Sequence, residues 1–99
     1  MNINGLLVSK HAINRMRERF RLYFPSLKIE EDNLTRSLIL GQLSKSIQCI
    51  KWKSIPFYTN MIGWKYGNIE VYRNGPVFYV VLNNRIVTTV LPKWFGEDI

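Results

Sequence analysis

The chain has 99 residues, a length that suits one domain, and 46% hydrophobic and 13% aromatic residues supply material for one core. This composition excludes a disordered tail, and we expect residues 1–99 to form a single domain. Fourteen Lys and Arg against seven Asp and Glu give a net charge of +7. Such a charge favours a polyanionic partner, nucleic acid above all, and the alternative is that it serves solubility alone.

The cysteine content and the apolar runs indicate a cytoplasmic protein. Cys49 is the only cysteine, so no internal disulfide can form, and its apolar neighbours predict a buried thiol rather than a nucleophile. No signal peptide is visible, and the apolar runs are too short to cross a bilayer. We therefore expect no membrane partner.

The first predicted helix runs from Ser9, a suitable N-cap, to about Phe24, with Pro25 ending it. Six residues at helical spacing form its apolar stripe: Ala12, Ile13, Met16, Phe20, Tyr23 and Phe24. His11, Arg15 and Arg19 are four residues apart and predict a straight ridge along the border of this stripe. Residues at such a border lie beside the core and can still reach a ligand.

A second helix is expected from about Ile29 to Ile50, because an acidic start precedes apolar residues at helical spacing. The rest of the chain predicts antiparallel strands over 68–73, 77–82 and 85–91, joined by turns at 74–76 and 83–84. Residues 54–61 predict a further strand, which Pro56 would restrict to an edge. The expected fold is α+β, with two N-terminal helices packed on one face of a three- or four-stranded antiparallel sheet.

Neither a metal nor an organic cofactor is expected from the sequence. One His, one Cys and scattered carboxylates show no metal-ligand spacing, and there is no glycine-rich phosphate loop.

The His11 ridge carries the residue types that metal-free RNA cleavage needs. An imidazole transfers protons near neutral pH, and the guanidinium of Arg15 can bind phosphate through two parallel hydrogen bonds. RNA supplies its own nucleophile, the 2′-hydroxyl. The alternative is a histidine flanking a helix whose arginines are an ordinary solvated face.

The segment from Ser9 to Arg19 reads SKHAINRMRER, and residues 87–91 read VTTVL. The segment resembles the S-x-H-A-x-x-R-M-x-x-R helix of a group of small bacterial and phage proteins, whose last strand has a similar apolar-Thr-apolar pattern. That group is placed with the RelE-like and colicin-like ribonuclease toxins, which have two helices on a curved antiparallel sheet. The resemblance implies His11 and Arg15 as active-site groups. It also implies a threonine of the last strand, Thr89 by first choice and Thr88 by second.

A second set of cations is interleaved with aromatic rings in the C-terminal half, at Lys53, Lys65 and Arg73. Bases can stack on such rings while cations follow the phosphates. The alternative is that these rings belong to the core or its rim. With Lys10 and Arg19, these three residues are the predicted nucleic-acid contacts.

We therefore predict a metal-independent, toxin-like endoribonuclease acting by 2′-hydroxyl transesterification, in which His11, Arg15 and Thr89 are catalytic. The second proton-transfer group would be a Tyr, a Glu such as Glu70, or water. Two alternatives stay open. One is a nucleic-acid-binding module without catalysis, and the other is a phage-type factor that inhibits a host or defence enzyme through its basic, aromatic face. Besides RNA, an antitoxin or a host protein is a possible partner.

Overall fold

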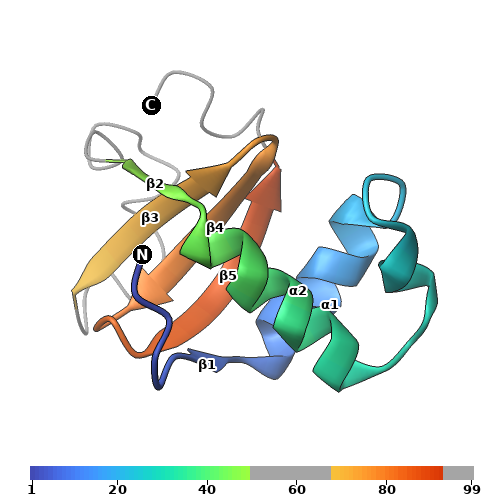
Figure 1. Cartoon of the computed structure of the whole chain (residues 1–99), viewed down its shortest axis with the longest axis horizontal. Coiled ribbons are helices and arrows are strands. Elements are labelled where there is room, and N and C mark those ends of the chain that lie inside the picture. Colours follow the sequence, from blue (N-terminus) through green and yellow to red (C-terminus); the bar gives the residue numbers. More distant parts are fainter. Residues whose placement is uncertain (50–67, 93–99) are drawn as a thin grey trace.

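The computed structural model describes residues 1–49 and 68–92, in which helices pack on one side of a five-stranded sheet (Figure 1). Its elements follow in chain order: β1 (Leu7–Val8), α1 (Lys10–Phe20), the 3-10 helix η1 (Pro25–Lys28), α2 (Asp32–Ser44), β2 (Ile47–Cys49), β3 (Ile69–Asn74), β4 (Val77–Leu82) and β5 (Ile86–Pro92). The predicted α+β class is confirmed. No helix of the described part is long and apolar enough to span a membrane.

The strands lie in the order β1-β5-β4-β3-β2. The three consecutive strands β3, β4 and β5 are antiparallel, as predicted. Their turns contain residues with positive φ, which is 59° at Gly75 and 54° at both Asn83 and Asn84. Glycine and asparagine tolerate this conformation best, which is why these positions mark the hairpins in the sequence.

The predicted sheet is wrong in two respects, and the second helix is shorter than predicted. The sheet is mixed rather than purely antiparallel, because β1 pairs in parallel with β5, and it has more strands than expected. A strand of two residues is too short to show an alternating pattern. The second helix ends at Ser44, and the residues expected to continue it form β2, which pairs with β3. The expected edge strand over 54–61 lies outside the described residues.

Local hydrogen bonds explain why α2 stops where it does. The Ser44 hydroxyl donates to the Gly41 carbonyl at 2.7 Å, and the Ser46 hydroxyl donates to the Leu43 carbonyl at 2.6 Å. Serine side chains thus occupy carbonyls that a continuing helix would need for its backbone. Ile47 and Cys49 instead pair with β3, and the backbone hydrogen bonds of this segment are formed in that antiparallel ladder.

Helix α1 begins as predicted and ends earlier. The Ser9 hydroxyl accepts a hydrogen bond from the Ala12 N–H at 3.0 Å, which confirms Ser9 as the N-cap. The helix ends at Phe20 instead of about Phe24. Tyr23 was expected in the apolar stripe but is mostly exposed, because it follows the end of the helix.

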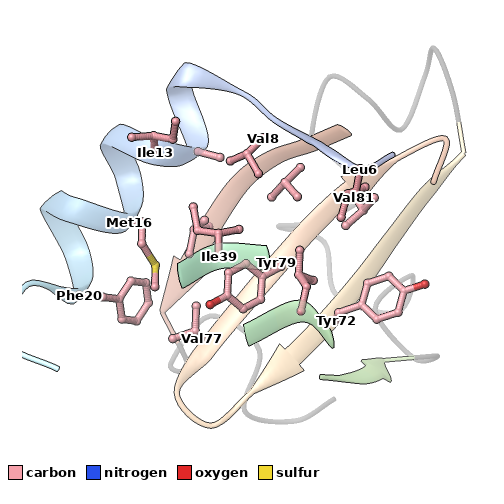
Figure 2. Close-up of a cluster of buried hydrophobic side chains, with 14 of the residues drawn as sticks. Leu6, Val8, Ile13, Met16, Phe20, Ile39, Tyr72, Val77, Tyr79 and Val81 are labelled. Atoms are coloured by element: carbon pink, nitrogen blue, oxygen red, sulfur yellow. The ribbon is translucent and has the colours of Figure 1, made fainter. Parts of the chain in front are cut away.

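The sheet is apolar on both faces. Figure 2 shows the cluster between sheet and helices, in which Met16 and Phe20 of α1 and Ile39 of α2 pack against Tyr79 and its neighbours. Strand β4 alternates between this cluster and a second one on the other face, whose buried members are Cys49, Ile69, Val71, Phe78, Val80 and Leu91. Cys49 is a buried free thiol, as predicted, and burial raises its pKa.

Candidate nucleic-acid interface

Helix α1 is fixed against the sheet at its first turn. Besides capping the helix, the Ser9 hydroxyl donates to the carbonyl of Thr88 at 3.1 Å. The ladder pairs Val80 with Thr89 and Val81 with Val87, so Thr88 is an extra residue that forms a β-bulge in β5. A bulge redirects its strand locally. Here the bulged residue Thr88 has its carbonyl at the start of the helix, where it accepts the hydrogen bond from Ser9.

His11 lies further from the core than the sequence suggested. At about 100° per residue, it points nearly opposite to the buried stripe of Ala12, Ile13, Met16 and Phe20. Its side chain is exposed. The predicted border position is occupied by Arg19, so the ridge is tilted across the helix and runs from the solvent side at His11 to the sheet side at Arg19.

Arg19 contacts the edge of the sheet. Its Nη1 donates to the Val90 carbonyl of β5 at 2.8 Å. Burial lowers the pKa of Arg19, the charge of Arg15 lowers it further, and the charge of Glu18 opposes both effects. Arg15, Glu18 and Arg19 are therefore one electrostatic cluster.

Arg15 and Glu18 are joined on the exposed side of this cluster. Arg15 Nη1 donates to Glu18 Oε2 at 2.5 Å, and both side chains reach solvent. Glu18 is not among the site residues predicted from the sequence, although its position three residues after Arg15 is a spacing at which helical side chains meet. We call His11, Arg15 and Glu18 the outward face of α1.

The other flank of α1 carries two cations that share one acidic partner. Lys10 and Arg17 both donate to Asp32 of α2, at 2.7 and 2.9 Å. The hydrogen bond from Lys10 and then that from Arg17 hold the pKa of the Asp32 carboxyl below its ordinary value. Lys10, a predicted nucleic-acid contact, thus lies beside the outward face but shares an acidic partner.

A surface hollow of about 580 Å³ lies along the same flank. It is lined by Asn14, Arg17, Glu18, Arg21 and Glu30. Arg21 Nη2 lies 3.5 Å from Glu30 Oε1, so two acids balance two arginines in the lining. The hollow therefore offers less attraction to an anion than the opposite, β5-facing side of the helix.

Thr89 is not brought to the outward face. Its ladder partner Val80 belongs to the cluster on the far side of the sheet, and paired residues share a face. Thr88 is nearer α1 through its backbone, but its hydroxyl donates to the Val80 carbonyl at 3.2 Å. A catalytic role for Thr89 stays a prediction, with the sheet between it and His11.

Arg73 also lies apart from α1. Its register partners Ile47 and Phe78 place it on the sheet face of the second cluster, and its charge lowers the pKa of the neighbouring Cys49 against the effect of burial. Glu70 lies on the same strand and accepts a hydrogen bond from the Gln48 side chain, with β4 and β5 between it and α1. Lys53 and Lys65 lie outside the described residues.

The arrangement thus brings together His11, Arg15 and Arg19 from the predicted site and adds Glu18. No group of three or more His, Cys, Asp or Glu that could hold a metal occurs in residues 1–49 and 68–92. Comparison with protein families, curated proteins and solved structures gives no match.

Proposed function

We propose that this protein binds RNA through the outward face of α1 and cleaves it without a metal, as an endoribonuclease of the RelE-like and colicin-like type. The observation that carries the proposal is that an exposed His11 and a half-buried, solvent-accessible Arg15 stand one turn apart on one helix. That helix is fastened to the sheet at both of its ends, through Ser9 and Arg19.

Arg15 is the expected phosphate contact. Its only ion pair in the described part of the chain is with Glu18, and both partners are solvent-accessible, so that pair contributes little stability. A phosphate, which accepts two parallel hydrogen bonds from a guanidinium, can therefore engage Arg15 at small cost. Arg19, one turn further on, adds positive charge beside the same site.

His11 is the expected proton-transfer group. It stands one turn before Arg15 with its ring in solvent, so a phosphate held by Arg15 would lie within reach of the imidazole. The RNA supplies the attacking 2′-hydroxyl, and the arginines offset the charge that builds on the phosphoryl oxygens.

The architecture agrees with the resemblance at the coarse level. Two helices precede three consecutive antiparallel strands and cover one face of the sheet. Assignment to the RelE-like and colicin-like group in particular rests on the motif of residues 9–19, and remains part of the proposal.

Binding without cleavage is the second candidate function. The observation that favours it is the place of Thr89, which the resemblance made a site residue and which lies across the sheet from His11. A third candidate, binding of a host protein or an antitoxin, is favoured by exposed apolar side chains after α1. Leu22 is 95% exposed and Tyr23 is 62% exposed.

The test combines binding and cleavage with one set of variants. RNA affinity should fall with salt at a log–log slope of roughly −0.7 per phosphate contacted, and Arg15→Ala should flatten the slope by about one contact. Lys45→Ala is the matched control, because it removes one exposed positive charge beyond the end of α2. The control should lower affinity less.

For cleavage, RNA is incubated with protein and chelator, and its ends are identified. We expect 2′,3′-cyclic phosphate ends, no cleavage of DNA, and a loss on the order of 10²–10⁴ in rate for His11→Ala. If the protein binds RNA in a salt-dependent way but leaves it intact, the cleavage proposal is rejected and the function is that of a nucleic-acid-binding module. A log–log salt slope near zero would show that nucleic acid is not the partner. Capture of one host protein would then support the third candidate, a protein-binding factor.

A further inference from the structure

We infer that Glu18 is the second proton-transfer group of the proposed RNA cleavage, acting with His11 on opposite sides of a phosphate held by Arg15. The inference rests on the proposed function. It supplies the partner that the sequence left open between a Tyr, Glu70 and water.

The helix sets the spacing of the two groups. Glu18 follows His11 by seven residues, so the two side chains leave α1 in directions about 20° apart and their Cα atoms are about 10.5 Å apart along the axis. Arg15 stands between them in height and about 40° to one side of His11. One helix thus presents an imidazole, a guanidinium and a carboxylate in a row.

This spacing fits an in-line displacement at phosphorus. The attacking and leaving oxygens lie on opposite sides of the phosphorus, and each exchanges its proton over a hydrogen bond of about 2.6–3.2 Å. The two proton-transfer atoms can therefore stand up to on the order of 10 Å apart, with the phosphate between them. Side chains that leave one helix two turns apart and in nearly the same direction are compatible with such a separation.

The surroundings of Glu18 agree with this role. Its side chain is 61% exposed, so an RNA strand can reach it, and one of its carboxylate oxygens accepts a hydrogen bond from Arg15. Its charge also acts on Arg19, which places it inside the cationic cluster. The carboxylate is oriented by the same guanidinium that would bind the phosphate.

The other described carboxylates are less suited, and Glu31 among them stands at the start of α2 rather than on α1. Asp32 accepts from both Lys10 and Arg17, and Glu30 lies against Arg21 across the hollow. Glu70 belongs to β3, two strands away from β5. Of the acids in the described part of the chain, Glu18 is the one on the outward face.

The step is balanced as a transesterification. The Glu18 carboxylate takes the proton of the 2′-hydroxyl, and the 2′-oxygen forms a bond to phosphorus. The bond from phosphorus to the 5′-oxygen breaks, and that oxygen receives a proton from the protonated imidazole of His11. The products are a 2′,3′-cyclic phosphate and a 5′-hydroxyl, and solvent then restores both side chains. The 2′-oxygen would face the C-terminal side of the site.

Glu18→Gln tests the inference, because it keeps the shape of the side chain and removes its basicity and charge. Cleavage of RNA should fall on the order of 10²-fold or more, as for loss of a general base, and the acidic limb of the pH–rate profile should disappear. Affinity for uncleaved RNA should stay the same or rise, because a negative charge beside Arg15 is gone. Glu30→Gln is the control: it makes the same change of charge at the Arg21 pair and should leave the rate unchanged.

The alternative outcomes separate the inference from the proposed function. If wild type cleaves RNA, His11→Ala is inactive and Glu18→Gln cleaves as fast as wild type or faster, Glu18 only neutralises Arg15 and the inference is overturned while the function stands. If wild type binds RNA and leaves it intact, the cleavage proposal itself fails, and the inference fails with it. Thermal unfolding by circular dichroism shows that each variant is folded, which we expect for a substitution at an exposed helix position.

Discussion

Arg19 has a structural contact with β5 and a proposed role in RNA binding, and different substitutions can test the two roles separately. Its Nη1 donates at 2.8 Å to the Val90 carbonyl at the edge of β5, so Arg19→Met should remove both a charge and a hydrogen bond while keeping the aliphatic stem. Hydrogen bonds to charged groups contribute about 1.5–3 kcal/mol. Since Arg19 lies at the surface, water can replace part of the bond, and we expect a loss of about 1 kcal/mol in the free energy of unfolding.

Urea denaturation followed by circular dichroism measures this loss, and a change of about 1 kcal/mol should lower Tm by roughly 4–8 °C in a domain of this size. Arg21→Met is the control, because its 3.5 Å pair with Glu30 is exposed and should contribute less than about 0.5 kcal/mol. Arg19→Lys keeps the charge. If Arg19 serves RNA only as a charge, the Lys variant should bind RNA like wild type. An Arg19→Met variant as stable as wild type would show that the Val90 contact does not hold α1 to the sheet.

Three further predictions concern stability. Ser9→Ala removes the helix cap and the bond to the Thr88 carbonyl together, and should lower the free energy of unfolding by about 1–2 kcal/mol in urea titrations; an unchanged midpoint would contradict the double role of Ser9. Burial raises the pKa of Tyr79, whose buried hydroxyl has no hydrogen-bond partner in the described part of the chain and points toward the Phe20 side of the core in Figure 2. Tyr79→Phe should therefore be at least as stable as wild type at neutral pH. Above about pH 10, the free energy of unfolding of wild type, but not of Tyr79→Phe, should fall through this group by up to about 1.4 kcal/mol per pH unit, because the unfolded state releases the Tyr79 proton first. Parallel pH–stability curves for the two proteins would refute this. The lowered pKa of Asp32 affects stability in the opposite pH direction. The stability that its carboxylate contributes is present above the pKa of the unfolded state and is lost as the pH falls below about 4. Asp32→Asn should therefore flatten the acid limb of a Tm–pH curve.

Much of the fold could be predicted because local signals and tertiary structure agree there. Ser9 at the start of α1 and the turn residues Gly75, Asn83 and Asn84 each have a local conformational reason that does not depend on the rest of the chain. The β3–β4–β5 meander follows from those turns.

The errors occur where the outcome depends on a distant partner. Ile47–Cys49 has apolar spacing compatible with a helix, and only pairing with β3 selects a strand. β1 is two residues long and gains its structure from parallel pairing with β5, far away in the sequence. No pattern within either segment could have shown this.

In the candidate site, too, the features that local sequence determines could be predicted, and those that depend on distant strands could not. The spacing of His11, Arg15 and Arg19 was correct because helical periodicity fixes it. The face of Thr89 was not decidable, because both sheet faces are apolar and a bulge at Thr88 shifts the alternation of β5. The face of Arg73 could not be predicted for a similar reason, since it depends on the register with β2 and β4.

The two fastened flanks of α1 give its outward face a fixed orientation. On one side Lys10 and Arg17 hold Asp32 of α2, and on the other Arg19 holds the Val90 carbonyl of β5. A charged group that is already positioned loses less conformational entropy when it binds a ligand. His11 and Arg15 can therefore bind RNA from a rigid helix, although both of their side chains reach solvent. It follows that loosening a flank, as in Asp32→Asn, should weaken RNA binding without removing any positive charge, whereas a purely electrostatic surface would bind RNA more tightly once that negative charge is lost.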